Sequence, residues 1–256
     1  MKVVILAGGR GSRLSEETYL KPKPMVEIGN APILWHIMKI YSFYGFNEFI
    51  ICCGYKGEMI KEYFMDYYVR ASDITIDLSN NSYEVHENVV EPWKVTLVDT
   101  GRDTNTAGRI MRIRKYLNDE PFMLTYGDGV SNVNISQLVE YHKNSKKIGT
   151  ITAAKPAGRW GAIQISEEGI VETFKEKMQS EQAYVNSGFA VFEPELFNYL
   201  LDETQQLERE PYEKLVADGQ MNAYKHDGFW HPMDTVNDKA VLEKYWESGA
   251  APWKVW

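Results

Sequence analysis

The chain has 256 residues, of which 44% are hydrophobic and 25% are charged, as is typical of a folded protein with a substantial core. Its formal net charge of -8 disfavours general binding to nucleic acids, which requires a basic surface. No apolar run reaches the length of a signal peptide or a membrane span, so we expect a cytoplasmic protein without a membrane partner.

The first expected strand leads into the densest group of functional residue types. Val3 to Leu6 is a short apolar run, which is typical of a strand buried on both faces. The glycine-rich stretch Ala7 to Gly11 follows at once, and glycines let backbone N–H groups approach an anion closely. Four cationic residues come next or lie within the loop: Arg10, Arg13, Lys21 and Lys23. The stretch therefore predicts a cradle for a polyphosphate.

The two common phosphate-binding motifs do not fit this stretch. The Walker motif ends in Gly-Lys-Ser/Thr, where this chain has Arg13 and Leu14. The dinucleotide-binding fingerprint needs a third glycine and an acidic residue after the second strand, but the chain has Leu14 and then Cys52-Cys53-Gly54. A dehydrogenase on a similar sheet is therefore the less favoured alternative, and NAD(P) binding would test it.

Helices and strands alternate after the loop. Apolar spacing predicts helices over 32–44 and 56–68, with a strand at 49–53 between them, and this order implies parallel pairing. That strand contains the two cysteines, which form neither a CxxC pair nor a zinc pattern and are expected to be buried and reduced. Alternating residues over 74–85 predict an inserted hairpin.

The rest of the chain is richer in strands. We expect further strands at 95–98, 122–126, 148–154, 161–165, 170–175, 184–192, 221–225 and 228–231. The expected helices cover 109–117, 138–142, 194–201, 211–217 and 235–247. The predicted fold is α/β and Rossmann-like: a mainly parallel or mixed sheet with helices on both faces and an additional strand-rich, substrate-binding part. We expect one domain over 1–256, with halves of about 1–130 and 131–256.

Two aspartates are candidate magnesium ligands. Asp128 lies between glycines at the carboxyl end of an expected strand, where open α/β sheets bind ligands. Mg²⁺ is commonly held by one or two carboxylates together with substrate phosphates, and Asp234 is the candidate partner. The alternatives are a turn residue for Asp128 and a helix N-cap for Asp234.

The opening motif is part of a longer pattern. It reads Leu6-Ala7-Gly8-Gly9-x-Gly11-Ser12-Arg13-Leu14, followed by Lys23-Pro24. This pattern resembles the signature of the sugar-phosphate nucleotidyltransferases. Segments 35–39 and 91–101 resemble the branch that uses CTP and glucose 1-phosphate, and the resemblance runs from Met1 to about Trp253. It implies that a sugar 1-phosphate oxygen attacks the α-phosphorus of a nucleoside triphosphate in line and that pyrophosphate leaves.

The resemblance also implies roles for individual residues. Arg13 would steady the leaving phosphates, Lys23 would neutralise charge on the α-phosphoryl group, and Asp128 would act with Asp234 on Mg²⁺, so Arg13, Lys23 and Asp128 are the candidate catalytic residues. The polar loop 100–109 could read the base, with Arg109 as a donor, although a solvated connection is the alternative. The candidate nucleotide-binding residues are Leu6, Ala7, Gly8, Gly9, Gly11, Ser12, Arg13, Lys23, Thr100, Gly108, Arg109, Tyr126 and Gly127.

The second half of the chain is expected to bind the sugar phosphate. Lys177 matches the lysine of the family's Glu-Lys-Pro motif, although Met178 replaces the proline and leaves the loop less rigid. A solvated strand edge and a simple turn are the alternatives for the residues in this part. The candidate residues are Gly161, Glu176, Lys177, Asn186 and Gly188.

The expected partners are CTP and a sugar 1-phosphate, with Mg²⁺ as the cofactor and CDP-glucose for surface-polysaccharide sugars as the product. We expect a homo-oligomer and no nucleic-acid partner. Two alternatives remain beside the dehydrogenase: a nucleotidyltransferase that prefers UTP or dTTP, and a catalytically silent regulatory subunit that binds nucleotide.

Overall fold

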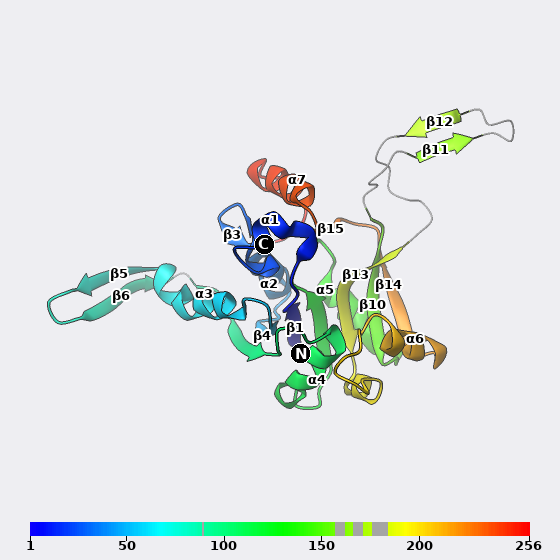
Figure 1. Ribbon diagram of the computed structural model, residues 1–256, viewed down its shortest axis with the longest axis horizontal. Helices are drawn as coiled ribbons and strands as arrows, with labels where there is room; N and C mark the ends of the chain where they lie inside the picture. Colours follow the sequence, from blue (N-terminus) through cyan, green and yellow to red (C-terminus); the bar gives the residue numbers. More distant parts are fainter. Residues whose placement is uncertain (89, 157–161, 166–170, 176–183) are drawn as a thin grey trace.

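A seven-stranded sheet forms the centre of the computed structural model, which describes residues 1–88, 90–156, 162–165, 171–175 and 184–256 (Figure 1). Its strands are β1 Lys2–Ala7, β4 Glu48–Cys53, β7 Lys94–Asp99, β8 Phe122–Tyr126, β10 Gly149–Ala154, β13 Val185–Phe192 and β14 Met221–His226. The strand order is β14-β10-β13-β8-β1-β4-β7. Strands from both halves of the chain therefore contribute to one sheet.

Pairing in this sheet is parallel except at one strand. β1 lies between β4 and β8 and is parallel to both, as β7 is to β4 and β14 is to β10. β13 is antiparallel to both of its neighbours, β8 and β10. The predicted mixed, mainly parallel α/β sheet is confirmed.

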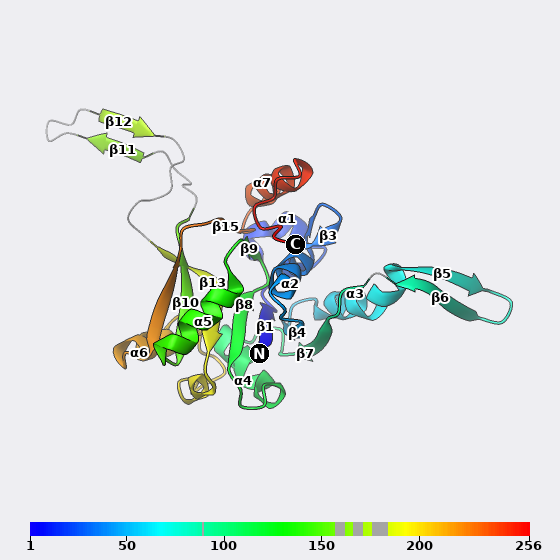
Figure 2. The ribbon, with the colours of Figure 1, turned by 180° about the vertical axis from the view of Figure 1, so that it is seen from behind.

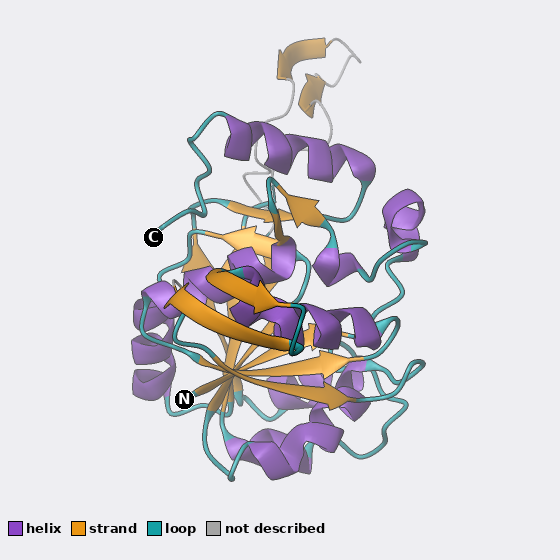
Figure 3. Ribbon diagram, turned by 90° about the vertical axis from the view of Figure 1, so that its left-hand side faces the viewer, coloured by secondary structure: helices purple, strands orange, loops and turns teal. Residues whose placement is uncertain are grey.

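Helices lie on both sides of the sheet (Figure 3), and a hydrophobic core covers each of its faces. Alternate residues of β1 explain this arrangement, because Val3 and Ile5 enter one core while Val4 and Leu6 enter the other. On the first face lie α2 Ile33–Phe43, α3 Gly57–Arg70, α5 Ile135–Ser145 and α7 Val236–Glu247; on the second lie α4 Thr106–Ile113 and α6 Glu210–Ala217. Across the described residues, none of the helices has the length and apolar composition that crossing a bilayer requires.

Two small antiparallel ribbons form sheets of their own, separate from the central sheet. β5 Ser72–Asp77 and β6 Ser82–Asn88 form the expected hairpin, which projects beyond α3 in Figures 1 and 2. β11 Ala162–Ile165 pairs with β12 Val171–Lys175 near the positions expected for two strands. The adjacent Cys52 and Cys53 are buried in β4 as free thiols, and burial raises the pKa of Cys53 to about 11.

Some elements differ from the sequence-based expectation. Helix α4 begins at Thr106 and not at Arg109. The first turn was not predicted because it contains Gly108, and glycine has a low helix propensity. Helix α4 ends at Ile113 and continues as the 3₁₀ turn η3 Arg114–Tyr116, and the expected helix after residue 194 is the 3₁₀ turn η4 Pro194–Asn198.

Several short elements were not expected at all. These are η1 Ser12–Leu14, α1 Ser15–Thr18, η2 Lys23–Met25, β2 Glu27–Ile28, β3 Ala31–Pro32 and β9 Gly129–Ser131. β9 pairs with β15 Trp230–Pro232, and its first residue follows Asp128 in what looks, from the sequence, like a simple turn.

Candidate active site

A cavity of about 360 Å³ opens at the carboxyl ends of β1 and β8. This is the edge at which open α/β sheets bind ligands. Loops after β1, β7 and β8 and the segment before α6 form its walls. Its lining comprises Leu6, Ala7, Gly8, Gly9, Gly11, Arg13, Lys23, Pro24, Thr104, Asn105, Thr106, Arg109, Tyr126, Gly127, Asp128, Gln206 and Glu208.

The cavity brings together most of the predicted nucleotide-binding residues. Thr100 and Gly108 lie outside its lining: the Thr100 hydroxyl is buried and donates to the carbonyl of Cys53 at 2.7 Å, and a Cβ on Gly108 would meet the carbonyl of Glu203 at 2.3 Å. Ser12 begins the turn η1. Gln206 and Glu208 were not predicted, since neither belongs to a recognisable motif.

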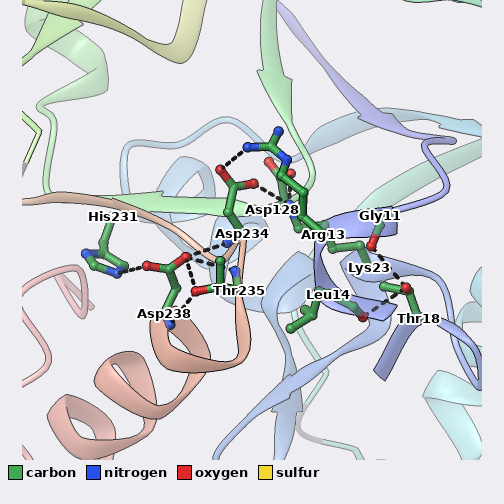
Figure 4. Close-up of polar contacts among 10 residues, drawn as sticks. All are labelled: Gly11, Arg13, Leu14, Thr18, Lys23, Asp128, His231, Asp234, Thr235 and Asp238. Atoms are coloured by element: carbon green, nitrogen blue, oxygen red, sulfur yellow. Dashed lines mark hydrogen bonds and ion pairs between the residues drawn. The ribbon is translucent and has the colours of Figure 1, made fainter. Parts of the chain in front are cut away.

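Lys23 lies at the centre of the charged end of this cavity (Figure 4). Its ammonium nitrogen is 2.7 Å from Oδ2 of Asp128 and 2.7 Å from Oδ1 of Asp234. Arg13 donates to the other oxygen of Asp234 at 2.9 Å. Burial lowers the pKa of Lys23, but the two carboxylates outweigh it and the net pKa is raised. Lys23 is therefore a fixed cation at neutral pH and not a proton acceptor.

The ribbon β9–β15 explains how Asp128 and Asp234 meet. In its antiparallel register Pro232 pairs with Gly129, so the residue before β9 lies beside the residues after β15. The N–H of Met233 donates to the carbonyl of Asp128 at 2.8 Å. One strand pair thus places two carboxylates, distant in the sequence, on the same lysine.

The turn after β15 is held by Asp238, which is buried in the first turn of α7 (Figure 4). Its Oδ2 accepts from the N–H of Asp234 at 3.1 Å, and from the N–H and hydroxyl of Thr235, each at 2.8 Å. Its Oδ1 is 3.3 Å from Nε2 of His231. Thr235, and not Asp234, is the N-cap of α7, so the capping alternative for Asp234 is wrong.

The side chains of Thr18 and Arg109 hold the glycine-rich loop by hydrogen bonds to its carbonyls. The hydroxyl of Thr18 donates to the carbonyls of Gly11 at 3.0 Å and Leu14 at 2.9 Å. The guanidinium of Arg109 donates to the carbonyls of Gly8 at 3.0 Å and Gly101 at 2.8 Å, and to further oxygens nearby. These bonds direct Arg109 toward the backbone of the loops, although it also lines the cavity.

The donor set at the charged end fits Mg²⁺. Asp128 and Asp234 offer two carboxylates beside the phosphate-binding loop, and Mg²⁺ takes its remaining ligands from phosphates and water. No group of three or more histidine, cysteine or acidic side chains in the described part of the chain could enclose a metal on its own. Such a site would therefore need substrate phosphate oxygens to complete it.

The candidate sugar-phosphate residues are only partly described. Gly161, Glu176 and Lys177 lie outside the described residues. Asn186 and Gly188 are on β13, where the N–H of Gly188 donates to Oδ1 of Asn186 at 3.0 Å. Neither lines the cavity, but a Cβ on Gly188 would meet the ring of Tyr126 at 2.2 Å, so β13 lies directly behind a cavity wall.

The sequence is similar over its whole length to those of known nucleotidyltransferases. The chain is 51% identical over 257 residues to glucose-1-phosphate cytidylyltransferase of Salmonella typhi, and the match covers 100% of both chains. It is 45% identical, again over 100% of both, to a probable glucose-1-phosphate cytidylyltransferase of Bacillus subtilis.

Two solved structures of low sequence identity support the assignment of the fold and nothing further. HddC from Yersinia pseudotuberculosis superposes with a TM-score of 0.70 at 21% identity, covering 96% of this chain and 99% of that one. A UDP-glucose pyrophosphorylase complexed with UDP-glucose gives a TM-score of 0.69 at 16% identity, with 97% and 98% covered. The family model for nucleotidyl transferases matches residues 2–247. The chain therefore belongs to the nucleotidyl transferase family, as the glycine-rich loop and Lys23-Pro24 indicated.

Proposed function

We propose that the protein is a glucose-1-phosphate cytidylyltransferase, which converts CTP and α-D-glucose 1-phosphate to CDP-glucose and pyrophosphate. The observation that carries this proposal is the Lys23 ammonium, held by Asp128 and Asp234 at the end of a cavity that the glycine-rich loop also lines. The 51% identity over the whole length of a protein of that name supports the choice of base and sugar.

The geometry suits transfer of a nucleotidyl group without a covalent enzyme intermediate. The sugar phosphate is already an anion, so its oxygen can attack the α-phosphorus without a general base. Lys23 is positioned to neutralise the charge that grows on the α-phosphoryl group, and Arg13 to hold the leaving phosphates. Backbone N–H groups around Gly8, Gly9 and Gly11 can approach the nucleotide closely.

Asp128 and Asp234 would hold Mg²⁺, which supplies charge neutralisation for the phosphate oxygens. Because both carboxylates also contact Lys23, the lysine keeps them in position before any substrate enters. On the sugar side, we assign Lys177 as a point charge for the sugar phosphate, with Gly161, Glu176, Asn186 and Gly188 around the sugar.

The setting of the reaction forms part of the same proposal. CDP-glucose would serve O-antigen and other lipopolysaccharide sugars, made in the cytoplasm. A homo-oligomer is supported by the projecting hairpin, where the large apolar side chains of Ile76, Leu78 and Tyr83 are exposed.

Pyrophosphate release over a matrix of four nucleoside triphosphates and several sugar 1-phosphates tests the proposal. We expect the highest kcat/KM for CTP with glucose 1-phosphate. Preference for UTP or dTTP would overturn the cytidylyl assignment and leave the nucleotidyltransferase standing. Nucleotide binding without turnover in every combination would instead indicate a silent regulatory subunit, and tight NAD(P) binding a dehydrogenase.

A further inference from the structure

Besides Asp128, the carboxylate of Glu208 lines the cavity. It lies at the wall that the segment before α6 forms. The hydroxyl of Tyr126 donates to its Oε1, and the hydroxyl of Thr106 donates to its Oε2 at 2.8 Å. The N–H of Leu207 in turn donates to the Thr106 hydroxyl at 2.8 Å. Two neutral hydroxyls therefore fix the orientation of this carboxylate, although the residue itself is exposed.

The charges around the cavity divide it into two ends. Arg13, Lys23 and Asp128 form one end, where the two cations suit a polyphosphate. Glu208 forms no ion pair within the part of the chain that the structure describes, so its charge is not neutralised. A triphosphate is favoured near Arg13 and Lys23 over the wall at Glu208, where no cation pairs with the carboxylate, and this orientation leaves the nucleoside facing Glu208.

The two acidic residues of the lining have different partners. Asp128 is occupied by Lys23, whereas Glu208 is held only by hydroxyls and keeps lone pairs for a ligand. Arg109, the other candidate for contact with the base, supplies donors and not acceptors, and its guanidinium already binds carbonyls of Gly8 and Gly101. A ligand that brings a hydrogen-bond donor to this wall would thus meet Glu208.

We propose that Glu208 accepts a hydrogen bond from the exocyclic amine of cytosine and thereby selects CTP over UTP. The inference rests on the proposed function and assigns its base specificity to one residue. Cytosine offers a donor at the position where uracil has a carbonyl oxygen, and a carboxylate can only accept. With UTP two acceptors would face each other, and the uracil carbonyl would find no donor in Glu208.

Replacement of Glu208 by glutamine tests this assignment. The amide keeps the shape, and its single oxygen can accept from one of the Tyr126 and Thr106 hydroxyls, while its NH2 group, unlike a carboxylate oxygen, can donate to the other hydroxyl and to uracil. We expect the ratio of kcat/KM for CTP to that for UTP to fall roughly tenfold to a hundredfold, as expected when one unmatched polar pair is relieved. The ratio for CTP over 2′-deoxy-CTP should not change, because the ribose is not involved.

Glu210→Gln is the matched control. Glu210 is exposed, lies two residues further on and accepts from Nε2 of Gln205 at 2.9 Å, so its substitution should leave the CTP/UTP ratio unaltered. If Glu208→Gln turns over too slowly, dissociation constants for CTP and UTP give the same ratio from binding alone.

Two outcomes would overturn the inference. One is an unchanged CTP/UTP ratio in Glu208→Gln; the other is a collapse of the preference for CTP over 2′-deoxy-CTP, which would assign Glu208 to the ribose. Failure of the proposed function is recognised separately, because the wild-type protein would then not use CTP with glucose 1-phosphate.

Discussion

Lys23 and Lys21 are two residues apart and have very different surroundings. Lys23 is buried between two carboxylates, whereas Lys21 contacts Glu27 at the surface at 3.1 Å. Pro22 and Pro24 flank Lys23 and restrict its backbone, with Pro22 at φ -66° before the turn η2. The position of the Lys23 ammonium is therefore set before substrate binds.

We predict that Lys23→Ala lowers kcat by roughly a hundredfold or more, because a preorganised charge is lost from the transition state. Lys21→Ala should change kcat less than about threefold, since exposed ion pairs contribute little. Single-turnover rates at saturating CTP measure both effects. Equal losses in the two variants would contradict a specific role and indicate a diffuse basic surface.

The neighbouring residues Asp234 and Thr235 have different roles: we expect Asp234 to affect turnover and Thr235 to affect the stability of α7. Asp234→Asn should lower turnover roughly a hundredfold and raise the Mg²⁺ concentration needed for half-maximal rate, while the melting temperature changes little. Thr235→Ala should cost about 1 kcal/mol of unfolding free energy, because the helix loses its cap. Melting temperatures and turnover rates of both variants test these expectations. A destabilised Asp234→Asn protein with normal turnover would refute the metal role.

At the scale of elements, the loop after β1 depends on close packing against Arg109. A Cβ on Gly8 would lie 2.1 Å from Nη1 of Arg109, whereas a Cβ on Gly9 would have nothing within 4 Å. The guanidinium donates to the carbonyls of Gly8, Cys53 and Gly101, at or just after the ends of β1, β4 and β7, so displacing it would disturb all three.

We therefore predict that Gly8→Ala lowers the unfolding free energy by roughly 1–3 kcal/mol, the cost of leaving buried polar groups unpaired. Gly9→Ala is the matched control and should unfold at nearly the wild-type denaturant concentration. Urea titrations of the two variants measure the difference; equal destabilisation would show that the packing of Arg109 is not the cause.

The parts of the fold and the site that the sequence predicted are those marked by short sequence patterns. The apolar run of β1, the glycines after it and Lys23-Pro24 all lie within the first 24 residues, and together they indicated the sheet, the loop and the phosphate end of the cavity. The contact between Asp128 and Asp234 depends on the pairing of β9 with β15, which no short pattern reveals. Glu208 was missed for a similar reason, since its position depends on Tyr126 and Thr106 from distant elements.

At the scale of the whole molecule, the hairpin β5–β6 exposes large apolar side chains. Ile76, Leu78 and Tyr83 are 59%, 88% and 64% exposed, and a lone two-stranded hairpin is only marginally stable in water. The apolar hollow at its base, between α3 and β7, contains further aromatic residues such as Phe64 and Trp93. These surfaces support the homo-oligomer that we propose.

Replacing the three apolar residues of the hairpin together, Ile76→Thr, Leu78→Ser and Tyr83→Thr, should shift the sedimentation coefficient to that of a smaller species. The control is Asp73→Asn with Glu84→Gln on the same hairpin, which should keep the wild-type mass. A wild-type protein that sediments as a monomer at micromolar concentration would overturn the prediction.

The ribbon β9–β15 also determines when the site can form during protein synthesis. Asp128 and Asp234 follow Lys23 by 105 and 211 residues, so the ribosome releases the second carboxylate long after the first. A nascent chain that has emerged as far as α6 already contains β1, β4, β7 and β8, yet it lacks the strand that carries Asp234 to Lys23. Translation that stops early, even close to the end of the message, would therefore release chains able to assemble much of the sheet with only half of the carboxylate pair.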